Sequence, residues 1–248
     1  MNRRIRGVAV DFEGPVIDFE KDGHHLAHRM AAKEAGIELT VQEAVDLIPN
    51  LSGGPGKLIA EQIFDLMKRR GITPQLNAEQ ILTRSSMHFK QFVQQIASGE
   101  RQIAPRPGFL NSLKRLREAE LKVTIGSSTL SEEFWIYWKA IGFDEYFDGN
   151  QIVLADEGSR IRHKPEPDIF LETARRMEID PAEQVVIEDS LRGLAAGVAA
   201  KSPVVGMTVY DCPSAIIPLY QTGAYRVFCS WLEVDILAVI DSLNNRGR

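Results

Sequence analysis

The stretch that decides the fold is residues 8–16, which read Val8-Ala9-Val10-Asp11-Phe12-Glu13-Gly14-Pro15-Val16. Its first residues are β-branched or small and apolar, which predicts a buried strand that ends at Asp11. A second carboxylate at Glu13 and a glycine at position 14 follow at once, and this combination is typical of a tight, charged loop. In an open parallel sheet, ligands bind beyond the carboxyl ends of the strands. The loop is therefore the first candidate for a functional site.

Length and composition indicate a globular protein with a sizeable core. The 248 residues exceed the commonest size of a single domain, which allows one large domain or a core with a smaller companion. Hydrophobic residues make up 44% of the chain and charged residues 25%, close to the averages of soluble proteins.

Charge, hydropathy and cysteine usage exclude several classes of function. The formal net charge of -5 provides no basic field for a polyanion, so we expect no nucleic-acid partner. No stretch approaches the roughly 18 apolar residues of a membrane span, so we expect a soluble protein without a membrane partner. Cys212 and Cys229 are too few for a disulfide framework and match no metal-binding spacing, which indicates a cytoplasmic protein.

The segment between residues 20 and 105 has helical patterns and no convincing strand. Apolar residues recur at helical spacing from His24 to Glu34, and Thr40 to Glu43 has the form of a capping box. Asn77 begins a further helical stretch that runs through about Ser98. We therefore predict an all-helical domain over residues 20–105.

From Pro107 onward, the patterns of helices and short strands alternate. Helices are expected over residues 109–116, from a cap at Ser131, and over 168–177, 191–200 and 232–243, and strands over 121–125, 151–155, 184–187, 202–209 and 225–228. This alternation implies right-handed crossovers and a parallel, doubly wound sheet. The fold class is therefore α/β, with a Rossmann-like core formed by residues 1–19 and 106–248.

Polar clusters follow three of the predicted strands. They are Asp11 with Glu13, Ser127 with Ser128 and Thr129, and Glu188 with Asp189. Where these strands are neighbours, their ends meet in one pocket, which Lys164 reaches from a loop. Several carboxylates at one sheet edge repel one another unless a cation lies among them, and hard oxygen ligands suit Mg²⁺. The lysine and the hydroxyls suit a phosphate.

Four motifs resemble those of the haloacid dehalogenase-like (HAD) hydrolase superfamily, in its phosphatase and phosphomutase branch with a helical cap. They are Asp11-Phe12-Glu13-Gly14-Pro15, Ile125-Gly126-Ser127-Ser128, Lys164-Pro165-Glu166-Pro167-Asp168-Ile169-Phe170 and Val186-Ile187-Glu188-Asp189-Ser190. Each motif alone is a weak signal. Four in the expected order, with a helical insertion after the first, cover nearly the whole chain and make the resemblance specific.

The resemblance implies a nucleophile and a metal site. Asp11 is the expected nucleophile, which attacks phosphorus and forms an aspartyl-phosphate. The Asp11 carboxylate, the backbone carbonyl of Glu13 and the Asp189 carboxylate are the expected ligands of Mg²⁺. Glu188 is expected either to contact the metal through its outer sphere or to brace Lys164.

The resemblance also implies which residues bind the substrate. Ser127 and Lys164 are expected to bind the phosphoryl oxygens. Ser128, in the same loop, is a candidate for substrate binding, since the ends of elements are uncertain by a residue. Lys57 is a second candidate, because it follows a glycine-rich stretch whose backbone can approach a ligand closely. The same stretch can equally be a hinge between helices.

Glu13 departs from the pattern of the family. Phosphatases of this kind usually carry Asp two residues after the nucleophile, where it protonates the leaving oxygen and later activates water. Glu keeps this chemistry but adds a methylene, about 1.5 Å of reach, and a misplacement of that size can cost roughly a hundredfold in rate. We therefore expect slower turnover, while metal binding through the backbone carbonyl is kept.

Three histidines stand near the start of the helical insertion. His24 and His28 are four residues apart, as in some metal sites, and His25 lies beside them. A zinc site needs a third ligand, which the sequence does not supply. We expect these side chains to line the surface of the insertion or to face solvent.

The expected function is that of a Mg²⁺-dependent phosphatase, a monomer or homodimer, that acts on a small phosphorylated metabolite. Two alternatives remain open. One is a phosphomutase of the β-phosphoglucomutase type, which returns the phosphoryl group to a second hydroxyl. The other, motivated by Glu13, is a catalytically weak member that binds a phosphorylated ligand or a partner protein. A dehalogenase is disfavoured because the resembling dehalogenases lack an acid at position 13.

Overall fold

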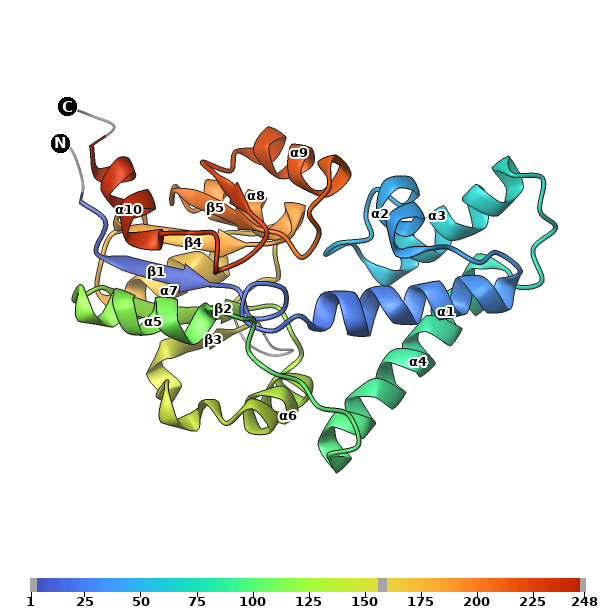
Figure 1. Ribbon diagram of the computed structural model, residues 1–248, viewed down its shortest axis with the longest axis horizontal. Coiled ribbons are helices and arrows are strands. Elements are labelled where there is room, and N and C mark those ends of the chain that lie inside the picture. The colour runs from blue at the N-terminus through green and yellow to red at the C-terminus, as the bar shows by residue number, and fades with distance from the viewer. Residues whose placement is uncertain (1–3, 156–159, 246–248) are drawn as a thin grey trace. The chain divides into compact units, whose positions relative to one another are not determined.

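The chain folds into two units in a computed structural model that describes residues 4–155 and 160–245. The larger unit comprises Met1–Asp18 and Ile103–Arg248, and the smaller unit comprises Phe19–Gln102. Figure 1 labels the helices and strands of both units. The larger unit carries the sheet, and the described elements of the smaller unit are all helical.

One parallel sheet of six strands forms the centre of the larger unit, in the order β3-β2-β1-β4-β5-β6. The strands are β1 (Gly7–Val10), β2 (Lys122–Ser127), β3 (Ile152–Leu154), β4 (Gln184–Glu188), β5 (Val204–Met207) and β6 (Val227–Phe228). The strand order runs in opposite directions on the two sides of β1, which makes the β1–β4 boundary a topological switch point. The predicted α/β class with a Rossmann-like sheet is confirmed.

Helices cover both faces of this sheet (Figure 1). They are α5 (Phe109–Glu118), α6 (Ser131–Ile141), α7 (Asp168–Met177), α8 (Leu191–Ala199), α9 (Pro213–Thr222) and α10 (Ile236–Asn244), with short 3-10 helices at Phe143–Glu145, Gly149–Gln151 and Pro181–Glu183. Helix α7 packs on β1, β2 and β3, α8 on β4 and β5, and α9 on β5 and β6, while α5 packs on β2 and α10. The strands are mostly apolar, as expected where both faces of a parallel sheet are covered.

The apolar core holds the loop after β1 in place. Phe12 lies between the two carboxylates of the loop and is fully buried. Its ring lies 4.5 Å from the ring of Phe134 and 6.1 Å from that of Trp138, measured between centroids. Both partners are on α6, so the aromatic packing fixes where the backbone of the loop leaves the sheet.

The smaller unit is a helical bundle with its own core. Its elements are a π-helix (Glu20–His25), α1 (Leu26–Ala35), α2 (Val41–Leu47), α3 (Gly56–Arg69) and α4 (Ala78–Ser98). The predicted capping box is present, with the Glu43 amide 3.2 Å from Thr40 Oγ1 and the Thr40 amide 3.0 Å from Glu43 Oε2. Ile59, Ile63 and Met67 face a common core with α1 and α4. Among the described residues, no helix has the length and apolar character that crossing a membrane requires.

Several predictions of local structure were wrong. Strand β2 continues to Ser127, so that residue ends the strand and does not lie in the following loop. Helix α6 takes Leu130 as its cap, and Ser131 is its first residue. Helix α10 begins only at Ile236, where Asp235 caps it. Helix α9 was not predicted, because Pro213 at its first position and Pro218 inside it make the segment look like a break.

Candidate active site

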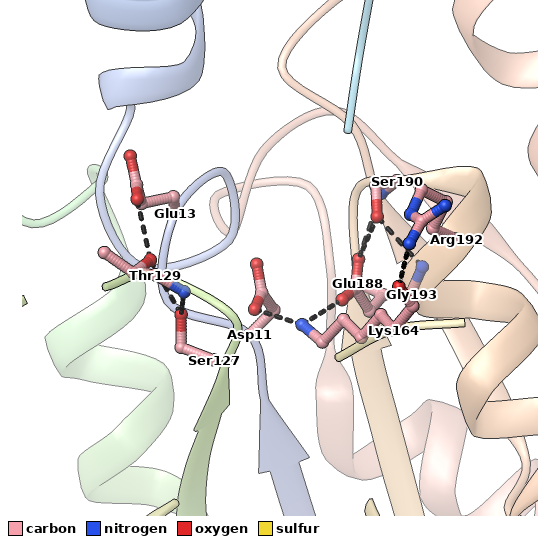
Figure 2. A network of polar contacts seen from close by, with 9 residues as sticks. All are labelled: Asp11, Glu13, Ser127, Thr129, Lys164, Glu188, Ser190, Arg192 and Gly193. Carbon is pink, nitrogen blue, oxygen red and sulfur yellow. Dashed lines mark hydrogen bonds and ion pairs between the residues drawn. The ribbon is translucent and has the colours of Figure 1, made fainter. Parts of the chain in front are cut away.

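The polar residues that follow β1, β2 and β4 lie at one edge of the sheet. Val10 of β1 pairs in register with Ile125 of β2 and with Ile187 of β4. The residues after these positions therefore emerge together at the carboxyl ends of three parallel strands. Figure 2 shows this group with a lysine from the loop before α7 and residues of α8; among those drawn are Asp11, Glu13, Ser127, Thr129, Lys164 and Glu188.

Three carboxylates converge at the switch point. Asp11, Glu188 and Asp189 each offer an oxygen atom, and these atoms lie within 4.8 Å of one another. The three residues are 7%, 0% and 5% exposed. Like charges this close, and shielded from water, repel strongly, so positive charge is needed among them.

Lys164 supplies one positive charge to this group. Its Nζ contacts Asp11 Oδ1 and lies 2.5 Å from Glu188 Oε1 (Figure 2). Burial alone would lower the pKa of Lys164, but Asp11 and Glu188 outweigh this effect and raise the pKa above its usual range. The ammonium therefore stays charged. Burial raises the pKa of the Asp11 carboxyl, against the lowering effect of Lys164.

Glu188 is held from two sides. While Oε1 faces Lys164, Oε2 accepts hydrogen bonds from the Ser190 amide and from Ser190 Oγ, both at 3.0 Å. A Cβ atom on Gly193 would lie 1.8 Å from Glu188 Oε1, so the first turn of α8 leaves space for this carboxylate only because that residue is glycine. Of the two roles left open for Glu188, the brace for Lys164 has a direct contact.

Gly14 lets the loop after β1 approach Asp189. Its φ angle is +95°, in the left-handed region that favours glycine. A Cβ atom at this position would lie 2.3 Å from the Asp189 carboxylate. The two acidic motifs, far apart in the sequence, are therefore packed against each other at the backbone of Gly14.

The side chain of Glu13 lies beside the hydroxyl groups that end β2. Thr129 Oγ1 donates a hydrogen bond to Glu13 Oε1 at 2.7 Å, and Ser127 Oγ donates to Thr129 Oγ1 at 2.8 Å. Glu13 is 8% exposed. Its carboxylate is not part of the three-carboxylate group. The contact with Thr129 was not predicted, although the run of hydroxyls from position 127 to 129 was the available signal.

The two candidates for substrate binding lie in different units. Ser128 is half-buried beside Ser127, and its Oγ makes no hydrogen bond within the described part of the chain. Lys57 is exposed in the first turn of α3, in the smaller unit.

The prediction that the three histidines line a surface or face solvent was wrong for two of them. His25, the last residue of the π-helix, and His28, in the first turn of α1, are 1% and 7% exposed. The pKa of each is lowered to about 3, mainly by burial. His24 stacks on the ring of Phe89, with 3.9 Å between centroids.

Arg106 clamps the loop after β1, a role that no sequence pattern predicted. Its guanidinium donates to the carbonyl of Gly14 at 2.8 Å and to three further carbonyls, those of Met207, Thr208 and Cys229. The Arg106 amide donates to the Val16 carbonyl at 2.7 Å, and Trp231 Nε1 donates to the Pro15 carbonyl at 2.7 Å. Every carbonyl from position 14 to 16 is thus held. The surrounding prolines and glycine indicated only a break.

At the carboxyl edge of the parallel sheet, buried carboxylates are paired with a lysine. This fold and this site define the protein as an α/β enzyme. The model of the haloacid dehalogenase-like hydrolase family matches residues 5–201, and the chain belongs to this family. The resemblance drawn from the four motifs is thereby confirmed, and the protein is a hydrolase by family.

Individual relatives support the same assignment. The chain is 25% identical to the putative phosphatase YhcW of Bacillus subtilis, over 98% of this chain and 100% of that protein. It is 27% identical to the fructose-1-phosphate phosphatase YqaB of Escherichia coli, over 81% of this chain and 95% of that protein. A solved haloacid dehalogenase-like protein of unknown function from Agrobacterium tumefaciens superposes with a TM-score of 0.78 at 23% identity, covering 96% and 99% of the two chains.

Some relatives are much longer than this chain. It is 29% identical, over 79% of its length, to the chloroplastic protein SUPPRESSOR OF QUENCHING 1 of Arabidopsis thaliana, but it spans only 17% of that protein. The activity and partners of such relatives therefore do not transfer to this chain as a whole.

Proposed function

We propose that this protein is a Mg²⁺-dependent phosphatase that hydrolyses a small phosphorylated metabolite through an aspartyl-phosphate on Asp11. The observation that carries the proposal is the buried group at the switch point, where Asp11 contacts Lys164 and lies beside Glu188 and Asp189. The names of two relatives, a putative phosphatase and a fructose-1-phosphate phosphatase, support the same reaction.

The residues at the sheet edge fit a magnesium ion. The three buried carboxylates carry more negative charge than the single ammonium of Lys164 offsets, and their oxygens are the hard ligands that Mg²⁺ prefers. The Asp11 and Asp189 carboxylates and the Glu13 carbonyl would hold it. Bound there, the ion supplies positive charge that offsets the repulsion between a carboxylate nucleophile and a phosphate.

Named residues would carry the two chemical steps. A carboxylate oxygen of Asp11 attacks phosphorus, and the ester P–O bond breaks with its electron pair moving to the leaving oxygen, which takes a proton from Glu13. Water then attacks phosphorus and gives a proton to Glu13, while the bond from Asp11 to phosphorus breaks and inorganic phosphate leaves. Lys164 would bind the phosphoryl oxygens during both steps, and the Ser127 hydroxyl would join it by turning its proton from Thr129 to the phosphoryl group.

The test is release of inorganic phosphate from a panel of small phosphomonoesters, sugar phosphates included, in the presence of Mg²⁺. We expect steady turnover of at least one ester, and its loss by at least a thousandfold in Asp11→Asn, which removes the nucleophile. Asp241→Asn is the matched control, because Asp241 is exposed on α10. Failure to turn over any ester contradicts the proposal, and recovery of an isomerised sugar phosphate in place of free sugar would assign a phosphomutase.

A further inference from the structure

Thr129 lies between two residues that the proposed reaction uses. Its hydroxyl donates to Glu13 Oε1 at 2.7 Å and accepts from Ser127 Oγ at 2.8 Å, and its amide donates to Ser127 Oγ at 3.1 Å (Figure 2). A hydroxyl has one proton to donate. Because a carboxylate oxygen accepts hydrogen bonds, the proton of Thr129 is directed to Glu13 whether or not Ser127 also donates to the Thr129 hydroxyl.

The position of Thr129 is fixed by the backbone around it. Ser127 is the last residue of β2, and α6 begins at Ser131, so Thr129 is anchored between a central strand and a helix. Threonine is also β-branched, which restricts rotation about its first side-chain torsion. The donor that reaches Glu13 is therefore rigid.

Glu13 needs such a donor more than a shorter acid would. Glutamate has one more rotatable side-chain bond than aspartate, so more of its conformations place the carboxylate away from the reacting atoms. A hydrogen bond to a charged carboxylate is among the stronger ones in proteins. One bond from a rigid donor can therefore select a single position for a flexible acid.

We propose that Thr129 is a positioning residue, which holds Glu13 where it exchanges a proton with the leaving oxygen and so compensates for its extra methylene. This inference rests on the proposed function. Thr129 touches neither substrate nor phosphorus and keeps its own proton throughout. Its hydrogen bond engages Oε1 of Glu13, and the exchanged proton is carried by Oε2.

The leaving group of the substrate provides the first test. The leaving oxygen of p-nitrophenyl phosphate departs without protonation, whereas that of an alkyl phosphate needs a general acid. In Thr129→Val, which keeps the shape but removes the hydroxyl, we expect kcat/KM to fall 10- to 100-fold for the alkyl ester turned over in the panel. For p-nitrophenyl phosphate we expect a change of less than about threefold. Thr129→Ser, which restores a hydroxyl, is expected to recover at least half of the loss on a logarithmic scale.

A double-mutant cycle with Glu13→Asp provides the second test. The shorter side chain of aspartate cannot span the same distance to Thr129, so Thr129→Val should cost less than about threefold when Asp stands at position 13. Circular dichroism and thermal unfolding check that each variant is folded. If Thr129→Val does not fold, Thr129→Ala replaces it in both tests.

The outcomes separate the two proposals. Three results would overturn the role of Thr129 and leave the phosphatase function standing. They are an equal loss of kcat/KM for both esters in Thr129→Val, an equal loss with Glu or Asp at position 13, and no loss at all. Absence of any ester turnover by the unsubstituted protein would overturn the phosphatase function, and the role of Thr129 with it.

Discussion

Single residues decide whether the acidic groups of this site can approach one another. Gly14 shows this directly, since a Cβ atom there would lie 2.3 Å from the carboxylate of Asp189. A side chain at position 14 can be accommodated only by moving that carboxylate or the loop. The site therefore requires glycine at position 14 as well as its acidic residues.

Replacing Gly14 by alanine should damage the site more than the fold. We expect Gly14→Ala to raise the Mg²⁺ concentration needed for half-maximal activity by at least tenfold, because the Asp189 carboxylate or the loop that carries Asp11 and Glu13 must move. We expect a loss of about 1–3 kcal/mol in the free energy of unfolding. A Mg²⁺ titration and urea unfolding measure the two effects.

Gly142→Ala is the matched control for this prediction. Gly142 also has a positive φ, +68°, but a Cβ atom there would meet nothing within 4 Å. Its substitution adds backbone strain without a collision. Equal Mg²⁺ dependence in the two variants would show that the approach of Gly14 to Asp189 is irrelevant to the metal site.

The sequence predicted those residues of the site whose type alone indicates their chemistry. Asp11 and Asp189 were placed together because they follow predicted strands, with Lys164 reaching them from a loop, and the structure brings these residues together. Thr129 and Arg106 could not be found in this way. A hydroxyl in a polar loop and an arginine between prolines have many uses, and only the three-dimensional contacts select one.

At the scale of elements, Arg106 joins three segments that lie far apart in the sequence. Its guanidinium binds carbonyls after β1, at the end of β5 and after β6. Arg106 is only 8% exposed, so these contacts are shielded from water. Buried carbonyls that lose a donor cost free energy, so the clamp stabilises the sheet edge as well as the loop.

Removing the clamp should therefore lower stability and activity together. We expect Arg106→Met to reduce the free energy of unfolding by about 3 kcal/mol or more, since several buried carbonyls lose their partner. The free energy of unfolding of Arg106→Lys should lie between those of Arg106→Met and the unsubstituted protein, because an ammonium cannot donate to all four carbonyls with the geometry of a guanidinium. Urea unfolding and kcat measure these effects.

Arg115→Met tests whether any loss of arginine has this effect. Arg115 pairs with Asp235 at 2.9 Å, but both side chains are substantially exposed. An exposed pair contributes about 0–1 kcal/mol, so this variant should unfold close to the unsubstituted protein. A comparable loss of stability in both variants would contradict the clamp.

The elements themselves were predictable where local signals agreed. The predicted capping box at Thr40 and the predicted helix start at Asn77 are both present, and Asp168–Met177 was predicted to the residue. The end of β2 was missed because Gly126 and Ser127 look like a turn. In the structure, packing of α7 against β2 overrides that preference, and a Cβ atom on Gly126 would lie 2.9 Å from Ile169.

At the scale of the whole molecule, each unit has its own core, and the smaller one contains two buried histidines. His28 has its pKa lowered to about 3 by burial and by nearby His24. His25 has its pKa lowered to about 3 by burial, His24 and His28, and Glu20 lies 3.4 Å from its Nε2. Both rings are therefore neutral in the folded state at neutral pH.

The stability of the smaller unit should fall as the pH is lowered. Because the folded-state pKa of each histidine lies below the value of 6.5, the unfolded chain binds more protons between pH 6.5 and pH 3, and unfolding is favoured as pH falls through that window. At pH 5 each buried histidine costs about 2 kcal/mol relative to neutral pH. Hydrogen exchange of amides within residues 19–102, at pH 7 and pH 5, measures the effect.

Two substitutions isolate this contribution from the other titrating groups of the chain. In His28→Leu, the difference in stability between pH 7 and pH 5 should shrink by about 2 kcal/mol, because the group that takes up the proton on unfolding is gone. His163→Gln should leave the difference unchanged, since His163 is exposed in the larger unit. An unchanged pH dependence in His28→Leu would mean that this ring is protonated in the folded protein, and that burial does not hold it neutral.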